Sequence, residues 1–431
     1  MELNQTYKGD WYSFWKIFKR IFIRPLFYII PLFLVLVIRL IKPIVFIRFG
    51  VIDIGRIGGI YQGEWYLSEK ANSKNSGSHI DFFFINKSTA HVNNQWARMW
   101  KRVLPYFPGS GLWVYIKRLN RLFPGYKCHE IPSHSVYPDL KTWQEHLMNP
   151  DLGKIDIFNK RLNAVLNQKT SNISFNEKEI LQGQSVLNDL GILNNNPYIC
   201  FHNRDSAYLN NVYKKPYDWS YHNYRDSNIN NYLPMADIMA KRGYYVLRMG
   251  AIIKDSISST NPKIIDYASN GKRTDFNDIY IGGHCKYFLC SDVGISAIPE
   301  IFRVPSVYVN WTQIRSISTW VLNGLFIFKK FYHKEEDRLM TFSELLNLSF
   351  GGNNTNEIIS NAGLELIENR PDEISSVAIE MDERLNGTWK PNKNDEELQN
   401  RFWALFGPNK IKSPNLRIGA EFLRQNQELL N

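Results

Sequence analysis

Short apolar runs alternate with stretches of helical spacing through the second half of the chain. The runs are rich in β-branched and aromatic residues, as is typical of strands buried on both faces. They occupy residues 198–201, 244–247, 286–290 and 306–309. Apolar residues at helical spacing lie between them, at 231–242 and 295–302. Strands separated by helices of this length predict βαβ units, and therefore a parallel sheet.

The first half shows a weaker form of the same pattern. Residues 44–47 and 80–85 are expected strands, and residues 96–104 are an expected helix. Glycines gather at 53–59, directly after the first strand, where they allow the backbone to turn tightly. Residues 105–150 show no clear period, and we expect them to be irregular.

A helix should close the first half. Ser174 and Glu177 have the spacing of a capping box, which predicts a helix that begins there and ends at Gly191. A polar run at 194–197 then forms a linker.

These elements predict an α/β fold with two Rossmann-like domains, at 43–193 and 194–350. Two domains also suit the length, because 431 residues exceed what one hydrophobic core usually supports. Residues 351–431 contain helical pieces and form a predicted helical extension.

The first 42 residues follow a different pattern. In 11–23, Trp and Phe lie at helical spacing opposite Lys and Arg, as in helices that lie in a bilayer interface. An uncharged run follows at 25–38, shorter than the roughly 20 residues of a spanning helix, with a proline at position 31. We therefore favour a segment that associates with the membrane surface. A short true span and a buried core helix are the alternatives.

Charge supports this interpretation. The chain has 52 Lys and Arg against 41 Asp and Glu, a net charge of +11. Residues 1–48 hold eight of the basic residues and two acidic ones, which leaves +5 for the other 383 residues. Anionic lipid attracts such a basic terminus, whereas the rest of the chain offers little charge for binding nucleic acid.

Composition excludes two further classes of protein. An apolar content of 44% excludes disorder over most of the chain. Four cysteines in so long a chain, none of them in a CxxC motif, exclude a disulfide scaffold and suit a reducing compartment.

Candidate chemistry gathers where three predicted strands end. In parallel sheets ligands bind beyond the carboxyl ends of the strands, guanidinium groups bind phosphate in a bidentate manner, and helix N-termini favour anions. The residues that follow these strands are His202, Arg204, Arg248, Ser291, Gly294, Ser296 and Glu300. Taken singly, the arginines could form surface ion pairs, the serines could cap a helix and the glutamate could be solvated. Their recurrence at three strand ends predicts an anion site, with Glu300 placed to bind a ribose diol.

The segment His202-x-Arg204-Asp205 resembles the HxR element of fucosyltransferase-like glycosyltransferases of the GT-B class. The chain also resembles a bacterial family of glycosyltransferases from surface-polysaccharide clusters. The stretches that carry this second resemblance are 221–226, 243–250, 278–280, 285–288, 291–294 and 380–381. It covers roughly residues 44–431 and is most specific at 198–311.

The resemblance implies a GT-B-like fold, in which two Rossmann-like domains face a cleft and the last helices pack back on them. In related enzymes the HxR arginine holds the pyrophosphate of a nucleotide-sugar, which implies this role for Arg204. The helix that carries Gly294, Ser296 and Glu300 resembles the donor-binding helix. The family pattern has a histidine after the glycines of the first loop, whereas position 59 is a glycine, so no catalytic base is carried over.

Several other motifs are absent from the sequence. No Asp-x-Asp motif occurs, which fits a site where arginines and a helix terminus neutralise the diphosphate without a metal. No His, Cys and Asp cluster has the spacing of a zinc site. A Walker loop and a GxSxG motif are also missing, which disfavours an NTPase or a serine hydrolase.

Together these features predict a glycosyltransferase, inverting or retaining, at the cytoplasmic face of the inner membrane. It would take a nucleotide-sugar donor and a lipid-linked or polysaccharide acceptor, use no metal cofactor, and contact the membrane through residues 1–42. Asp53 is the first candidate for a general base, while Arg204 and Arg248 would stabilise the leaving diphosphate. Further candidates for the base are Glu64, His79 and His91. The alternative is a non-catalytic nucleotide-sugar or glycan-binding scaffold of a membrane polysaccharide assembly.

Overall fold

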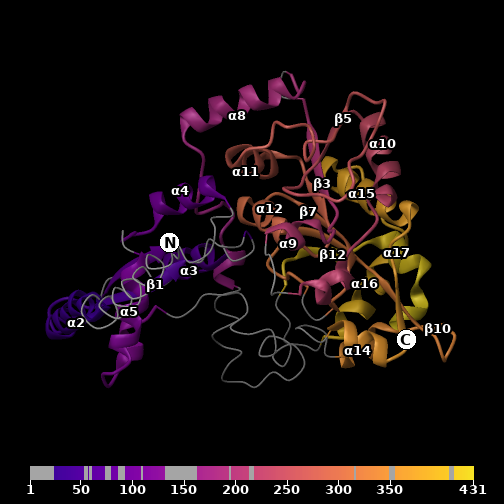
Figure 1. Cartoon of the computed structure of the whole chain (residues 1–431). Helices are drawn as coiled ribbons and strands as arrows, with labels where there is room; N and C mark the ends of the chain where they lie inside the picture. The colour runs from indigo at the N-terminus through magenta and orange to yellow at the C-terminus, as the bar shows by residue number, and fades with distance from the viewer. Residues whose placement is uncertain are drawn as a thin grey trace, which may run out of the picture.

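The structure is a computed structural model of the whole chain (Figure 1). It describes residues 24–52, 57, 61–72, 79–85, 93–107, 110–131, 163–193, 196–212, 218–314, 317–348, 355–406 and 412–431. The predicted helix at 11–23 therefore lies outside the described residues.

The second half of the chain forms a parallel sheet of seven strands, in the order β12-β8-β7-β6-β3-β4-β5. Every neighbouring pair in this sheet is parallel, so the carboxyl ends of all its strands meet at one edge. The strands are β3 (Tyr198–His202), β4 (Tyr245–Arg248), β5 (Ile264–Ile265), β6 (Phe288–Cys290), β7 (Ser306–Trp311), β8 (Asn323–Phe328) and β12 (Asn415–Ile418). The prediction of an α/β fold with a parallel sheet is confirmed.

Helices cover both faces of this sheet. Figure 1 shows α11 (Asp275–His284) and α12 (Ala297–Phe302) on one side, and α10 (Leu233–Lys241) and α15 (Pro371–Asn386) on the other. Strands enclosed in this way are buried on both faces, which is why β6 and β7 read as continuous apolar runs. Further helices of this half are α9 (Ala207–Val212), η4 (Ser220–Arg225), η5 (Ile229–Tyr232) and η6 (Gly294–Ser296).

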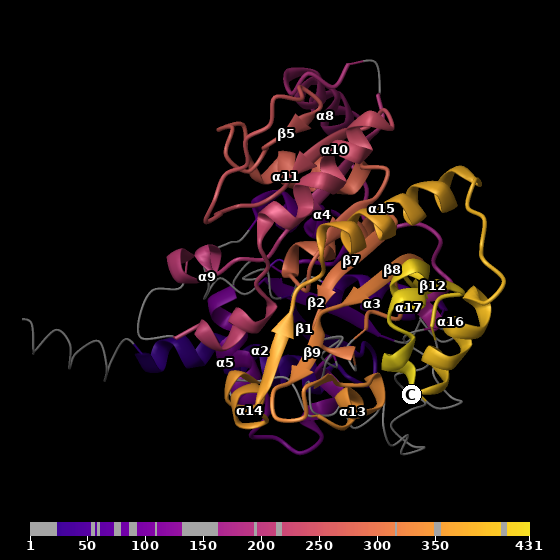
Figure 2. The ribbon, with the colours of Figure 1, turned by 90° about the vertical axis from the view of Figure 1, so that its right-hand side faces the viewer.

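We expected residues 351–431 to form a helical extension, but their described part is not wholly helical. They contain α14 (Thr355–Asn361), α16 (Asp395–Ala404), α17 (Ala420–Gln425), η8 (Gln427–Leu430) and two short strands, β11 (Leu364–Ile367) and β12. Four-residue strands are too short to show a period in the sequence. Strand β11 joins β9 (Lys330–His333) and β10 (Arg338–Leu339) in a small antiparallel sheet, and α13 (Phe342–Asn347) follows β10. Figure 2 shows α15, α16 and α17 close to β7, β8 and β12.

Helix α8 (Glu177–Asp189) begins at a capping box two residues later than predicted. The side chain of Asn176 accepts from the Glu179 backbone N–H at 3.0 Å, and the Glu179 carboxylate accepts from the Asn176 N–H at 2.9 Å. The predicted pair of Ser174 and Glu177 was wrong because an asparagine forms the same cap as a serine, and here it has a glutamate three residues after it.

In the first half, strands β1 (Ile47–Ile52) and β2 (Ile80–Ile85) form a parallel pair. The first strand begins three residues later than expected, since the chain at 44–46 is still turning away from the preceding helix. Isolated parallel bridges to Glu130 and Tyr106 extend the pair on either side. The helices around it are α3 (Tyr61–Asn72), α4 (Asn94–Val103), α5 (Ser110–Asn120) and η3 (Tyr126–His129). The described pair is consistent with a Rossmann-like half, and the facing-domain GT-B arrangement stays a prediction.

Helix α5 and the turn η3 correct our expectation that 105–150 would be irregular. The helix carries apolar side chains around most of its circumference, which conceals the helical period. It packs against α2 (Arg24–Leu40), where the rings of Tyr28 and Tyr115 meet edge to face with centroids 4.7 Å apart.

Helix α2 contains the predicted apolar run and has Pro31 inside it. Its Val35 and Ile38 are buried in one cluster with Phe84 and Ile116, so α2 is part of the core of the first half rather than a separate segment. No helix in the described part of the chain is both long enough and apolar enough to cross a membrane.

Candidate functional site

The carboxyl edge of the seven-stranded sheet brings several basic side chains together. Arg204 follows β3, Arg225 ends the 3-10 helix η4, and Lys329 follows β8. Two of these three were not predicted as site residues. Their charges lie close enough to interact: the charge of Arg225 lowers the pKa of Arg204, and the charge of Arg204 lowers the pKa of Lys329.

Arg204 is buried and held by the edge itself. Its backbone N–H donates to Oγ of Ser291 at 2.9 Å, which ties the end of β3 to the end of β6. Its guanidinium forms an ion pair with Asp226 through Nη1, and among the described residues its Nη2 has no hydrogen bond. Burial, together with the nearby charge of Arg225, lowers the pKa of Arg204 to about 10. A buried guanidinium with an unpaired Nη2 can bind an anion there.

Lys329 was missed, although the rule that found Arg204 applies to it. It is the first residue after the buried strand β8, and Arg204 likewise comes shortly after a buried strand, two residues beyond the end of β3. Its Nζ donates to the carbonyl oxygens of Tyr224 (3.2 Å) and Asp226 (2.5 Å). The pKa of Lys329 is lowered to about 8, chiefly by burial; the charge of Glu368 opposes this shift and that of Arg204 adds to it. An anion bound between these two cations would stabilise their charged forms, which burial and mutual repulsion disfavour.

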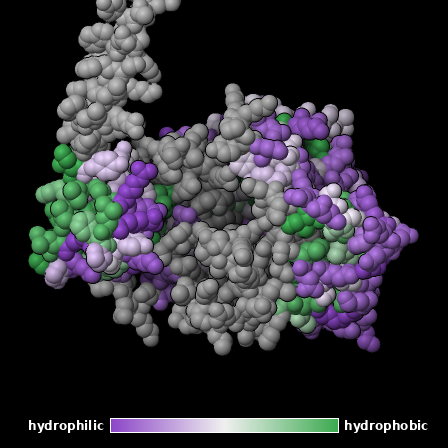
Figure 3. Space-filling model, turned by 60° about the horizontal axis from the view of Figure 1, so that its bottom comes forward, coloured by the Kyte–Doolittle hydropathy of each residue, from purple (hydrophilic) through white to green (hydrophobic). Residues whose placement is uncertain are grey.

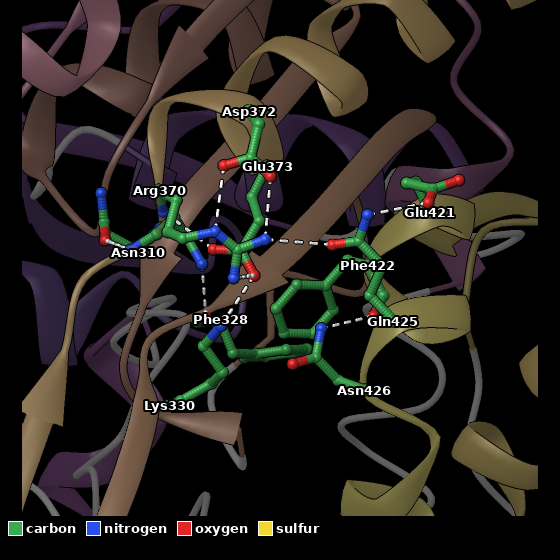
Figure 4. A network of polar contacts seen from close by, with 11 residues as sticks. Asn310, Phe328, Lys330, Arg370, Asp372, Glu373, Glu421, Phe422, Gln425 and Asn426 are labelled. Carbon is green, nitrogen blue, oxygen red and sulfur yellow. Dashed lines mark hydrogen bonds and ion pairs between the residues drawn. The ribbon is translucent and has the colours of Figure 1, made fainter.

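The neighbouring residue Lys330 points to the other side and has a structural role. Its Nζ donates to the carboxylate of Glu373 at 2.8 Å, and both groups are buried (Figure 4). The second oxygen of Glu373 accepts from the backbone N–H of Arg370 at 2.8 Å. Successive side chains of an extended chain face opposite ways, so one lysine of the pair serves the core and the other serves the edge.

Arg225 contributes a third cation near the edge. Its Nη1 lies 3.7 Å from the carboxylate of Asp292, which stands two residues beyond β6. Its Nη2 donates to Nδ1 of His222 at 2.7 Å. The hydroxyl of Tyr224 accepts from Nε2 of Gln313, after β7, at 2.6 Å. Segment 222–226 is therefore attached to strand ends on both sides of it.

A chain of buried hydrogen bonds supports this segment from below. Asn203 Nδ2 donates to the carbonyl of Ser227 at 2.9 Å, and Oγ of Ser227 lies 2.9 Å from the hydroxyl of Tyr232. Asn310 continues the chain, since its Nδ2 donates to the Tyr232 hydroxyl at 3.1 Å. Asn310 interrupts the register of β7 and has a φ of 53°, a conformation that asparagine tolerates better than most residues.

The same chain reaches β8 through Asn369. Its side-chain oxygen accepts from the Asn310 N–H at 2.6 Å, and its Nδ2 donates to the carbonyl of Phe328, next to Lys329, at 2.7 Å. Fully bonded buried polar networks rigidify the backbone around them. The network thus holds the ends of β3, β7 and β8 in one arrangement. It also holds the carbonyls of Tyr224 and Asp226, to which Lys329 donates.

Arg248, the second predicted arginine, lies at the end of β4 and is committed to protein partners. Its Nη1 donates to the carbonyl of Asp255 at 2.5 Å, its Nη2 to Oδ1 of Asn203 at 3.4 Å, and Asp266 lies 3.7 Å away. Burial lowers its pKa, while the carboxylate of Asp266 acts in the opposite direction. The arginine therefore anchors the loop between β4 and β5, and its contact with a donor stays a prediction.

His202 bridges the two strand ends. Its Nδ1 donates to the carbonyl of Met249 at 2.8 Å, so this ring nitrogen carries the proton of the neutral form. Burial lowers the pKa of His202 to about 4. The histidine is therefore uncharged at neutral pH and contributes orientation rather than charge.

The predicted Ser/Gly turn lies beside Arg204. Ser291 is fully buried by its contact with Arg204, whereas Gly294 is exposed at the start of η6 and Ser296 ends that turn. Glu300, in α12, accepts from the hydroxyl of Tyr308 at 2.6 Å and from Nε1 of Trp320 at 2.7 Å. These contacts account for the burial of Glu300, and its predicted role with a ribose diol stays a prediction.

The candidate bases are dispersed. Asp53 and His91 lie outside the described residues. Glu64 is buried in an ion pair with Arg303, which caps α12. His79 precedes β2, where it adjoins the salt bridge of Arg48 with Asp81. Within the described part of the chain, the contacts of Glu64 and His79 therefore do not include Arg204, Arg225 or Lys329.

The remaining apolar contacts join the two halves close to this edge. Ile52, the last residue of β1, belongs to one buried cluster with Ile298 of α12, and Ile57 and Ile295 pack against that cluster. The end of β1 and the turn that precedes α12 therefore contribute to the same apolar cluster. Among the described residues, no group of three or more His, Cys, Asp and Glu side chains is arranged to hold a metal ion.

Comparisons with known proteins provide a weak match only. No protein-family model and no curated protein matches the chain. It is similar to the crystal structure of the glycosyl transferase family 9 from Veillonella parvula DSM 2008, with 13% identity and a TM-score of 0.35 over 61% of this chain and 80% of that one. It is also similar to E. coli ADP-heptose lps heptosyltransferase II, with 13% identity and a TM-score of 0.34 over 61% of this chain and 84% of that one. Similarity at this level does not carry a function from one chain to another.

Proposed function

We propose that the protein is a nucleotide-sugar glycosyltransferase whose donor diphosphate binds at the carboxyl edge of the seven-stranded sheet. The observation that supports this most is the state of Arg204: it is buried, its Nη1 is paired with Asp226, and its Nη2 has no hydrogen bond within the described chain. Lys329 lies near enough for the charge of Arg204 to lower its pKa. Two desolvated cations in one place favour a ligand with several negative charges.

The proposed mechanism rests on the charge of the leaving group. As the bond between sugar and diphosphate breaks, the diphosphate gains negative charge. Arg204 and Lys329 would stabilise that charge without reorganising, because the ends of β3 and β8 are held by the buried network through Asn310 and Asn369. The Ser291 hydroxyl, bonded to the Arg204 N–H, keeps the arginine backbone in place.

We propose further that no metal is needed, since arginine and lysine can supply the positive charge that a divalent cation supplies elsewhere. The acceptor hydroxyl would be deprotonated by a base of the first half, for which Asp53 remains the candidate. The proposal covers inverting and retaining transfer. The acceptor we propose is lipid-linked or a polysaccharide, presented at the cytoplasmic face of the inner membrane.

One observation favours a second candidate function, a scaffold that binds a nucleotide-sugar without turning it over. Of the candidate bases, Glu64 is paired with Arg303 and His79 adjoins Arg48 and Asp81. Position 59 has a glycine where the family pattern has a histidine. A chain with a donor site and no base would bind the donor and leave it intact.

The test is a panel of UDP-, GDP-, dTDP- and CMP-sugars, each measured for thermal stabilisation and for release of free sugar or nucleotide. A bound donor at 100 times its dissociation constant stabilises a protein by about 2.7 kcal/mol. Stabilisation with slow donor hydrolysis supports the transferase, and hydrolysis should persist in EDTA. Stabilisation without hydrolysis or transfer supports the scaffold. No stabilisation by any donor contradicts both proposals.

A further inference from the structure

Helix α2 is apolar on two opposite stripes, of which the protein covers one. The covered stripe includes Pro31, Val35 and Ile38, at helical spacing. The other stripe also consists of apolar residues and is exposed. Its most exposed members are Leu40, at 81% exposure, and Phe33, at 64%. The whole stripe consists of Ile29, Ile30, Leu32, Phe33, Leu36 and Leu40. A helix that is apolar all round is normally enclosed by protein or by lipid.

Helix α5 and the loop after it continue this exposed apolar surface. Val114 on α5 and Leu122, two residues beyond its end, are 46% and 75% exposed, and Arg118 on the helix is exposed too. Ile44, just beyond α2, is 86% exposed. Figure 3 shows apolar residues gathered on the side of the molecule where α2 and α5 lie. We call this the α2–α5 surface, made of the exposed apolar residues of 29–44 and 114–122.

The two helices are held together, so the surface is one body. Arg39 of α2 donates from Nη2 to Oδ1 of Asn120 at 3.0 Å and from Nη1 to the carbonyl of Pro124 at 3.0 Å. Its guanidinium also lies over the ring of Phe123, 4.9 Å from the centroid. These contacts join the C-terminal end of α2 to the end of α5, while Tyr28 and Tyr115 join the helices further back.

The charge around this surface has one sign. The segments 24–52 and 110–131 contain eight Lys and Arg and a single acidic residue, Glu130. The cations also lie among the exposed apolar residues in the sequence: Lys42 stands between Leu40 and Ile44, and Arg118 stands between Val114 and Leu122. Apolar side chains beside exposed cations are the chemistry of an interfacial membrane contact, and they match an anionic lipid surface.

We infer that the α2–α5 surface docks the protein on anionic lipid, with the exposed stripes of both helices entering the interface. The inference rests on the proposed function, in which the acceptor is presented at a membrane. It extends the membrane contact beyond residues 1–42 to helix α5, which the sequence pattern did not reveal. Removing residues 1–42 would also uncover Ile116 and Phe84, which α2 covers. Such a truncation therefore damages the core of the first half instead of only detaching the protein from lipid.

The test is flotation of the full chain with vesicles of phosphatidylcholine alone and with vesicles that also contain phosphatidylglycerol. No donor or acceptor is present, so the result does not depend on the proposed transfer reaction. The full chain should float with the anionic vesicles and bind the neutral ones much more weakly. Failure to float with anionic vesicles overturns the inference and leaves the glycosyl-transfer proposal untouched.

Point variants separate the two helices. Leu36→Asp and Val114→Asp, each on an exposed stripe, should each weaken binding to the anionic vesicles while the thermal midpoint is kept. Leu181→Asp is the matched control, because Leu181 is 67% exposed on α8, away from the surface, and should bind as the unchanged protein does. If Val114→Asp also binds unchanged, α5 is not part of the docking surface and the inference is wrong.

Charge variants address the lipid chemistry. Replacing Lys42 and Arg118 by glutamine should weaken binding to anionic vesicles by about 30-fold at low salt, since each cation near an anionic surface contributes about a factor of five. Lys178→Gln on α8 is the control. If the unchanged protein instead forms dimers without lipid that Leu36→Asp dissociates, and these dimers do not bind vesicles, the surface is an interface between two copies and the inference is overturned.

Discussion

Two arginines stand at the ends of neighbouring strands, and their surroundings differ. Arg248, after β4, donates to the Asp255 carbonyl and to Asn203 and lies near Asp266. Arg204, after β3, has one ion pair, from Nη1 to Asp226, and its Nη2 has no hydrogen bond among the described residues. A buried donor without a hydrogen bond is costly, so Arg204 is the arginine that gains most from a bound anion.

The difference comes from the loop that follows each strand. The chain after β4 folds back so that Asp255 and Asp266 meet Arg248 locally, seven and eighteen residues later. The chain near Arg204 also brings a carboxylate, Asp226, which pairs with its Nη1, but it adds two further cations, Arg225 and Lys329. A basic residue after a buried strand therefore indicates a ligand site where the following loops bring further cations beside it.

The largest effect that separates the two arginines is expected for Arg204→Ala. Removing a preorganised cation from the leaving diphosphate should lower turnover by about two to three orders of magnitude, on the scale of a lost oxyanion-hole donor, with the thermal midpoint kept. Arg204→Lys should rescue only part of the loss, because a point charge does not replace a two-pronged contact. Turnover under saturating donor measures both. Lys390→Ala, at an exposed position, is the control and should have no effect.

Lys329→Met should have the next largest effect. A hydrogen bond to a charged group contributes about 1.5–3 kcal/mol, so donor affinity or turnover should fall by roughly ten- to a hundredfold. Lys330→Met supplies the contrast, because it leaves the buried carboxylate of Glu373 without its cation and should destabilise the fold instead. Urea unfolding together with turnover distinguishes the two outcomes. Unchanged turnover of a folded Lys329→Met protein would remove this lysine from the site.

Arg248→Ala should act mainly on stability. It takes a donor from the Asp255 carbonyl and a cation from the vicinity of Asp266, for a loss of about 1–3 kcal/mol in the free energy of unfolding. Turnover should fall less than in Arg204→Ala, because the substitution would act only by displacing the loop between β4 and β5. A fully stable Arg248→Ala protein with the same loss of turnover as Arg204→Ala would mean that both arginines bind the donor directly.

A smaller effect is expected from pH. Burial, aided by the charge of Arg204 and opposed by that of Glu368, brings the pKa of Lys329 to about 8, below the ordinary 10.5. The site therefore loses a positive charge as pH rises through 8, and diphosphate affinity should fall by about tenfold between pH 7 and pH 9. The free energy of unfolding should instead rise with pH above 8, because Lys329 is then more protonated in the unfolded chain than in the folded one. Titrations at both pH values check this, and Lys329→Met should abolish the pH dependence of affinity.

Much of the sheet could be predicted from the sequence, because β3, β4, β6 and β7 are enclosed on both faces and read as apolar runs. The same reading placed Arg204, Arg248 and Ser291 at one edge. It missed β8 and therefore Lys329, although the apolar run before Lys329 carries the same signal as the others. It also gave no indication that Glu300 would be bonded to Tyr308 and Trp320, since those contacts depend on how distant segments pack.

The central claim is that the edge beside Arg204 binds the diphosphate of a nucleotide-sugar. Calorimetric titration of UDP, GDP and dTDP into the unchanged protein and into Arg204→Ala tests it most directly, because the free diphosphate carries the charge that develops in the reaction. We expect one of these nucleotides to bind the unchanged protein about a hundredfold or more tightly than it binds Arg204→Ala. Equal affinity for the two proteins, with Arg204→Ala folded, would show that the diphosphate binds elsewhere and would contradict the claim.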